Sequence, residues 1–154
     1  MNFSKITDSL YIGTTPRSED YPILRNMGVG LVINMRFERR PYPDLHNPPM
    51  RVLWLPSVDS PLFPISIQKL HEGVDAALET LESGLAVYSH CHYGVHRAVA
   101  IGTSILIALG HPVEEAMQMV KQRRQVADPG TWYIRRRIER FAASWGQLQQ
   151  GVTS

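Results

Sequence analysis

The sequence predicts an α/β domain, with a short, mostly parallel central sheet flanked by helices. Short apolar runs alternate along the chain with longer amphipathic segments, a pattern typical of βα units. Gly and Pro stand at the transitions between these segments. A chain of 154 residues can form one hydrophobic core but has little room for a second. We therefore expect a single domain over residues 1–146, followed by a disordered tail over 147–154.

The expected strands are short and apolar, as strands buried inside a sheet are. Gly13 closes the first of them and Pro56 stops the third. Four prolines fall within residues 36–50, so this segment is expected to be a loop. The four strands are expected at residues 10–12, 31–34, 52–55 and 85–88.

The expected helices are recognised by apolar residues at three- and four-residue spacing and by their end signals. Ser18 can cap a short first helix that runs toward Met27. A helix over 67–81, ended by Gly84, is amphipathic, and the one that follows Arg97 is almost entirely apolar. Two further helices begin after Pro112 and after a turn at 128–130. The expected helices run from 18 toward 27, over 67–81, from 97 to 110, from 112 through 120 and over 134–145.

Composition narrows the classes of function. A formal net charge of +2 is too small to indicate nucleic-acid binding, although it suits an anionic substrate. Cys91 is the only cysteine, so no intrachain disulfide can form and a reducing, cytoplasmic location is expected. The first residues lack the apolar stretch of a signal peptide. The longest apolar stretch, 98–109, is far shorter than the roughly 20 residues of a membrane span, so we expect no stable membrane association.

The segment 87–97, Val-Tyr-Ser-His-Cys-His-Tyr-Gly-Val-His-Arg, carries the chemistry. A strand enters, a loop turns at Gly94, and a buried helix begins at Arg97. Convergent backbone amides and the positive end of the helix dipole bind anions, and an arginine can hold two phosphate oxygens. The same field favours the thiolate form of a cysteine. This pattern predicts a phosphate site in which Cys91 is the nucleophile.

Two other interpretations of the segment are weaker. Cys91 would be an ordinary core residue if its neighbours were apolar, but His90, His92 and His96 are poor neighbours for a core position. The same three histidines and the cysteine are zinc ligand types. A zinc site would lack a second ligand cluster and would leave Gly94 and Arg97 unexplained. We therefore expect neither a metal nor a cofactor.

The segment resembles the signature of the cysteine-dependent protein tyrosine phosphatases, His-Cys followed by five residues and Arg, and within them that of the small dual-specificity phosphatases. The likeness extends over about residues 6–145, including 6–13 and 26–34. It implies an α/β sandwich, Cys91 as nucleophile and Arg97 as the phosphate clamp. It also implies that His90 supports the loop and that its variable positions shape the substrate-binding floor and walls: His92, Tyr93, Gly94, Val95 and His96.

The same family uses an aspartate as general acid about thirty residues before the cysteine. Asp59 lies 32 residues before Cys91, directly after an expected strand. The leaving oxygen needs a proton, and a carboxyl group can supply it. Asp128 is an alternative acid, but its Ala-Asp-Pro-Gly context is typical of a turn. The arginines at 123–140, Arg124 among them, are expected to form a solvated basic face.

The sequence departs from the family at Ala98, where Ser or Thr usually follows the arginine. This departure casts doubt on rapid breakdown of a phosphocysteine. The expected function is hydrolysis of phosphotyrosine in proteins, with hydrolysis of phosphoserine and phosphothreonine left open. The alternatives are a phosphatase of phosphoinositides or other non-protein phosphates, and a slow phosphate-binding module. A rhodanese-like sulfurtransferase has no need of Asp59 and builds its cysteine loop differently.

Overall fold

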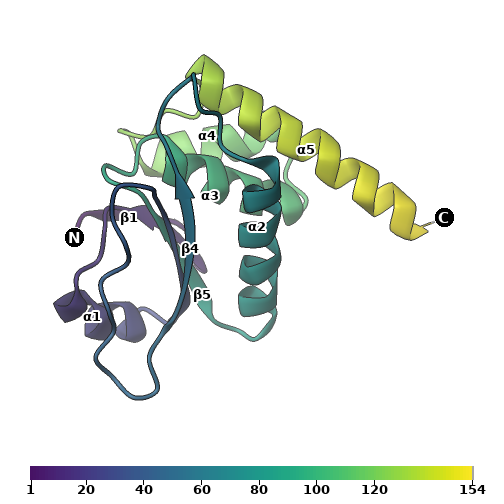
Figure 1. The fold of residues 1–154 in the computed structure, drawn as a ribbon. Coiled ribbons are helices and arrows are strands. Elements are labelled where there is room, and N and C mark those ends of the chain that lie inside the picture. The colour runs from purple at the N-terminus through teal and green to yellow at the C-terminus, as the bar shows by residue number, and fades with distance from the viewer. Residues whose placement is uncertain (154) are drawn as a thin grey trace.

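The computed structural model describes residues 1–153, with side chains described through Gly151. A five-stranded sheet forms the centre of this part of the chain, and helices lie on both of its faces (Figure 1). The strands are β1 (Phe3–Thr7), β2 (Leu10–Gly13), β3 (Val29–Arg36), β4 (Arg51–Ser57) and β5 (Ala86–His90). The helices are α1 (Tyr21–Asn26), α2 (Ile67–Glu82), α3 (Arg97–Ala108), α4 (Val113–Arg123) and α5 (Trp132–Thr153). A 3₁₀ turn, η1 (Ser18–Asp20), precedes α1.

The order of the strands places β5 in the middle of the sheet, as β1-β2-β5-β3-β4. β2, β5, β3 and β4 run parallel, and only the edge pair β1 and β2 is antiparallel. The expected mostly parallel sheet is therefore confirmed. Because β5 pairs on both sides and all five of its residues are buried, the loop that follows it begins from a rigid position.

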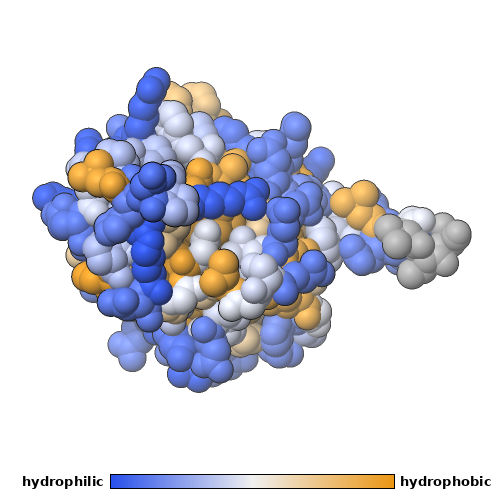
Figure 2. Space-filling model, turned by 90° about the horizontal axis from the view of Figure 1, so that it is seen from below, coloured by the Kyte–Doolittle hydropathy of each residue, from blue (hydrophilic) through white to orange (hydrophobic). Residues whose placement is uncertain are grey.

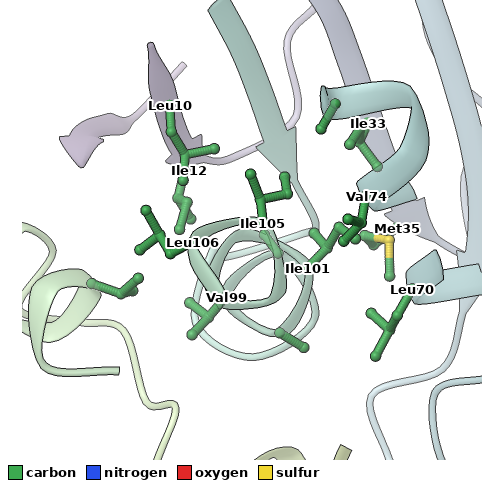
Figure 3. Packing of buried hydrophobic residues seen from close by; sticks show 14 of the residues in the cluster. Leu10, Ile12, Ile33, Met35, Leu70, Val74, Val99, Ile101, Ile105 and Leu106 are labelled. Carbon is green, nitrogen blue, oxygen red and sulfur yellow. The ribbon is translucent and has the colours of Figure 1, made fainter. Parts of the chain in front are cut away.

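Alternate strand residues pack on opposite faces of the sheet, as the pleat requires. On one face Leu31, Ile33 and Met35 pack with α2 and α3, and this larger cluster surrounds the apolar helix α3 (Figure 3). On the other face Val32 and Tyr88 pack against Tyr21 and Leu24 of α1. Every residue of helix α3 except the last is buried, which explains why its sequence is almost entirely apolar.

Four details differ from the expected elements. The sequence did not predict β1, because Ile6 is its one buried residue and the strand has no apolar run. The expected helix from Ser18 to Met27 divides into η1 and α1. β4 includes Pro56, which lies on the edge strand where no partner needs its missing N–H. The expected disordered tail over 147–154 is helical through Thr153, because α5 continues past the end of the core; Ser154 lies outside the described residues.

The carboxyl ends of the parallel strands lie at the upper end of the molecule in Figure 1, where the loops after β3, β4 and β5 gather. This is the edge at which parallel sheets bind ligands. Figure 2 shows the opposite end, where hydrophilic side chains surround a smaller apolar area and α5 projects to one side. No helix in the described part of the chain is long and apolar enough to cross a membrane.

Candidate active site

The loop between β5 and α3 makes an abrupt turn at Gly94. Its φ of +67° lies in the left-handed region that favours glycine. A Cβ on Gly94 would lie only 2.7 Å from a terminal nitrogen of Arg124 and 2.8 Å from the Gly13 carbonyl oxygen. Both the backbone angle and the close approach of Arg124 and Gly13 therefore require glycine at position 94.

Arg124 holds the outer side of this loop. Its Nε donates to the Gly94 carbonyl oxygen at 2.9 Å and its Nη2 to the Tyr93 carbonyl oxygen at 3.0 Å, while Nη1 reaches Asn2 and Ser4. In a trans peptide the following N–H points opposite to the carbonyl. The N–H groups of Gly94 and Val95 therefore point away from Arg124, in the direction that an anion cradle needs.

The expectation for Arg124 was wrong. The sequence placed it in a solvated basic face, whereas the structure leaves only 3% of it exposed. Its neighbour Arg123 is exposed, as expected. Nothing in the local pattern separates two adjacent arginines at the end of a helix, since the loop that Arg124 contacts lies 30 residues earlier.

Arg97 begins α3 and is fixed by two acceptors from other segments. Its Nη1 and Nη2 donate to the two carboxylate oxygens of Glu38 at 2.8 and 3.0 Å, and Nη1 also donates to the Ser57 carbonyl oxygen at 2.8 Å. The hydrogen bonds from Arg97 lower the pKa of Glu38 to about 2, so the pair is ionised at neutral pH. Sequence reasoning missed Glu38, because it lies in the loop after β3 without any motif around it.

The contacts with Glu38 and Ser57 do not use the Nε–H of Arg97. It is buried and has no hydrogen-bond partner among the described residues. Nε and Nη2 share one edge of the guanidinium, and this edge has the spacing that meets two phosphate oxygens. Glu38 and Ser57 thus orient Arg97 while leaving the Nε–H, on its phosphate-binding edge, without a partner among the described residues.

Cys91 and His90 are both buried where β5 ends. The carbonyl oxygen of Cys91 accepts a hydrogen bond from the Thr15 hydroxyl at 3.2 Å, and Thr15 in turn accepts from Arg36. Burial lowers the pKa of His90 to about 3, so its imidazole is neutral at physiological pH. His90 therefore adds no positive charge behind the loop, and any support it gives Cys91 is through packing and hydrogen bonding.

Asp59 lies across the site from the loop, after β4. Its Oδ2 is 2.9 Å from the Nδ1 of His96, and its Oδ1 accepts a hydrogen bond from the Tyr133 hydroxyl at 2.7 Å. Asp128 instead accepts hydrogen bonds from Thr131 at the start of α5, which agrees with the expected turn role. The sequence did not predict the contact between Tyr133 and Asp59, because nothing in the sequence distinguishes Tyr133 from the other residues of the last helix.

These groups surround one cavity of about 170 Å³. It is lined by Asp59, Cys91, Tyr93, Val95, His96 and Arg97. The structure therefore brings together the three residues expected to be catalytic. Neither His92 nor Gly94, both expected to shape the site, is among these lining residues; His92 is exposed and packs edge-on against the Tyr93 ring. No group of three His, Cys, Asp or Glu side chains among the described residues is arranged to hold a metal ion.

Comparison with known proteins places this geometry in a family. No protein-family model matches the chain. Over 150 residues it is 27% identical to dual specificity phosphatase 28 of Mus musculus, covering 96% of this chain and 82% of that protein. The chain is thus similar to the cysteine-dependent protein tyrosine phosphatases. A further relative within this family is the protein-tyrosine-phosphatase MKP1 of Arabidopsis thaliana, 31% identical over 131 residues, of whose length the chain spans 16%.

Solved structures agree on the phosphatase fold. Human DUSP28 superposes with a TM-score of 0.80 at 22% identity, over 92% of this chain and 93% of that one. PTPMT1, in a complex with PI(5)P, superposes with a TM-score of 0.82 at 21% identity, over 96% of this chain and 98% of that one. The dual-specificity-like sandwich expected from the sequence is confirmed.

Proposed function

We propose that this phosphatase hydrolyses phosphotyrosine in proteins, and phosphoserine or phosphothreonine more slowly, through a phosphocysteine on Cys91. The observation that carries the proposal is the unpaired Nε–H of Arg97, whose side chain lines the same cavity as Cys91 and Asp59. A buried donor without a partner costs about 1–3 kcal/mol. A phosphoryl group held on that edge removes this cost and lies beside the nucleophile.

The reaction has two halves. The Cys91 thiolate attacks phosphorus, the bond to the leaving oxygen breaks, and Asp59 supplies the proton that this oxygen needs. Water then attacks the phosphocysteine, Asp59 takes a proton from it, and the sulfur leaves. Throughout, Arg97 and the loop amides hold the equatorial phosphoryl oxygens, whose negative charge the dipole of α3 also favours.

The rim of the cavity favours an aromatic phosphate ester. Tyr93 lines the cavity and its side chain is 69% exposed, so its ring is free to pack against a phenyl group. A short alkyl ester such as phosphoserine gains less from this contact. We therefore place phosphotyrosine first among the protein substrates.

The second candidate substrate class is a phosphoinositide or another non-protein phosphate. The structural likeness to PTPMT1, solved in complex with PI(5)P, is the observation that favours it. Against it, the loop carries no lysine to meet further phosphates, since its variable positions are His92, Tyr93, Val95 and His96. A slow phosphate-binding module, suggested by Ala98, is the third candidate, and the presence of Cys91, Arg97 and Asp59 in one cavity argues against it.

An activity panel tests the proposal. The purified protein is assayed against phosphotyrosine, phosphoserine and phosphothreonine peptides and a set of phosphoinositides, beside Cys91→Ser. We expect the highest kcat/KM on phosphotyrosine peptides and no turnover by Cys91→Ser. Turnover by Cys91→Ser near the wild-type rate removes Cys91 as nucleophile, and a preference for phosphoinositides selects the second candidate. We also propose a cytoplasmic location, which suits a single unpaired thiol.

A further inference from the structure

Both carboxylate oxygens of Asp59 are already engaged by other side chains. Oδ1 accepts the Tyr133 hydroxyl hydrogen at 2.7 Å and Oδ2 lies 2.9 Å from the Nδ1 of His96. An ionised carboxylate is a pure acceptor and suits two such donors. A general acid must nevertheless carry a proton when the leaving oxygen departs. Either partner of the contact between Asp59 and His96 can hold that proton, because a histidine Nδ1 is a donor or an acceptor according to its tautomer.

His96 has the position for this role. Its Nδ1 faces Asp59, and its Nε2 lies 3.7 Å from the Oδ2 of Asp128, so each ring nitrogen faces a carboxylate. His96 is at the N-cap position of α3, and its side chain is 21% exposed. Both ring nitrogens of His96 therefore have a carboxylate oxygen toward which a ring N–H can donate.

We propose that His96 stores the proton that Asp59 delivers to the leaving group, so that the two side chains act as one proton carrier. The proposal rests on the proposed function and deepens it. In the first half-reaction the leaving oxygen takes a proton from Asp59 as its bond to phosphorus breaks, and the Nδ1 proton of His96 passes to Asp59. The state after this half holds neutral His96, ionised Asp59 and the phosphocysteine.

The second half-reaction restores the carrier. Water attacks the phosphocysteine, the bond between phosphorus and sulfur breaks, and the Cys91 thiolate is regenerated. The proton that water loses passes to Asp59 and from there to Nδ1 of His96. Protons and charges balance over the cycle, and no other reactant is needed.

Other groups around His96 are consistent with this assignment. Asp59 comes from the loop after β4, Asp128 from the turn before α5 and Tyr133 from α5, and the positive Arg97 is the next residue. Tyr133 is a poor alternative proton store, because burial, together with its hydrogen bond to Asp59, raises its pKa to about 12. Tyr133 therefore orients Asp59, and His96 is the neighbour of Asp59 that can take up and release a proton.

The test compares two variants of the same carboxylate contact. His96→Asn places an amide N–H near the position of Nδ1 but cannot carry an additional proton. Tyr133→Phe removes the other hydrogen bond to Asp59 and leaves His96 in place. For each, kcat/KM is measured against pH with an alkyl phosphate, whose departure needs a proton.

We expect the basic limb of the profile to move to lower pH by at least about one unit in His96→Asn, since an isolated carboxyl releases its proton near pH 4 and an imidazole near pH 6.5. In Tyr133→Phe the limb should remain within about 0.3 unit of the wild type while kcat/KM falls. Superimposable limbs in His96→Asn and wild type overturn the proposal, because a merely structural tether changes the rate without moving the limb.

A second measurement needs no variant at His96 itself. The imidazole proton of His96 is titrated by NMR in the wild type and in Asp59→Asn, and we expect its loss at clearly lower pH in Asp59→Asn. An unchanged titration refutes the shared proton. The proposed function fails separately, if the wild type shows no Cys91-dependent turnover of any phosphate ester.

Discussion

Arg124 and Gly94 are in direct contact, with the Arg124 Nε 2.9 Å from the Gly94 carbonyl oxygen. The two residues come from the end of α4 and from the loop after β5. A buried arginine thus fixes the direction of two peptide groups of the loop, so that their N–H groups point away from it. The phosphate cradle is therefore made by the loop sequence together with a side chain outside it.

Arg124→Met should distort the loop and destabilise the domain. Methionine fills part of the space, but it leaves the Tyr93 and Gly94 carbonyl oxygens without donors, at about 1–3 kcal/mol for each unsatisfied group. We expect kcat/KM on an aryl phosphate to fall by at least tenfold and Tm to decrease. The matched control is Arg123→Met on the exposed neighbour, which should change neither by much; equal effects of both variants would contradict the assigned role.

Glu38→Gln should show a loss of stability that depends on pH. The pKa of Glu38 is lowered to about 2 by Arg97, so its ionised form is favoured in the folded state. A lowered folded pKa contributes stability that is complete above the ordinary value of about 4.3 and is lost as pH falls toward 2. The Tm difference between wild type and Glu38→Gln, measured from pH 7 to pH 2, should therefore be largest above pH 5 and shrink in acid. A difference that stays constant over this range would show that the charge on Glu38 is unimportant.

Asp59→Asn should slow the reaction according to the leaving group. Asparagine preserves the shape of the side chain but has no acidic proton. With alkyl phosphates we expect a loss of about 100-fold or more, and with aryl esters of acidic phenols a loss below about tenfold, because such phenols leave without full protonation. Asp75→Asn, on the exposed side of α2, is the control. Equal losses on both ester types would mean that Asp59 is structural.

How far the sequence predicts the site depends on the distance between the partners. Cys91, Gly94 and Arg97 were predictable, because a strand, a turn and a helix start within one short segment determine their geometry. Asp59 was predictable only through the resemblance to the phosphatase family, whose general acid lies about thirty residues before the cysteine. Glu38, Arg124 and Tyr133 were not, because each reaches the site from another loop or helix, and only the packing of those elements makes the contact.

The same distinction applies to the fold. The buried strands and α3 can be recognised in the sequence as apolar runs. β1 cannot, because it is a polar edge strand with a single buried side chain. Helix α5 simply continues beyond Gly146. The sequence after Gly146 shows no pattern from which this extension could be predicted. Local composition thus predicts the core elements. The edge strand and the end of the last helix depend on tertiary context.

Ala98→Ser should accelerate breakdown of the phosphocysteine. Ala98 is buried in the first turn of α3 and has no hydroxyl to donate to the departing sulfur of Cys91. A hydrogen bond to a charged group contributes about 1.5–3 kcal/mol, equivalent to about one to two orders of magnitude in rate.

The measurement is rapid-mixing kinetics with an aryl phosphate. We expect a burst in the wild type, and in Ala98→Ser a faster steady state with a burst rate that is nearly unchanged. Ala100→Ser, a buried position further along the same helix, should not accelerate the steady state. The absence of a wild-type burst together with no acceleration in Ala98→Ser would refute the idea.

Direct capture of the phosphoenzyme tests the central assignment of Cys91 most sharply. The wild type is mixed with an aryl phosphate, quenched within one turnover, digested and mapped by mass spectrometry. Our account predicts one added phosphoryl group on the peptide that contains Cys91, formed at the burst rate and absent from Cys91→Ser. Turnover without any phosphorylated Cys91 peptide, or with the phosphoryl group on another residue, would contradict it.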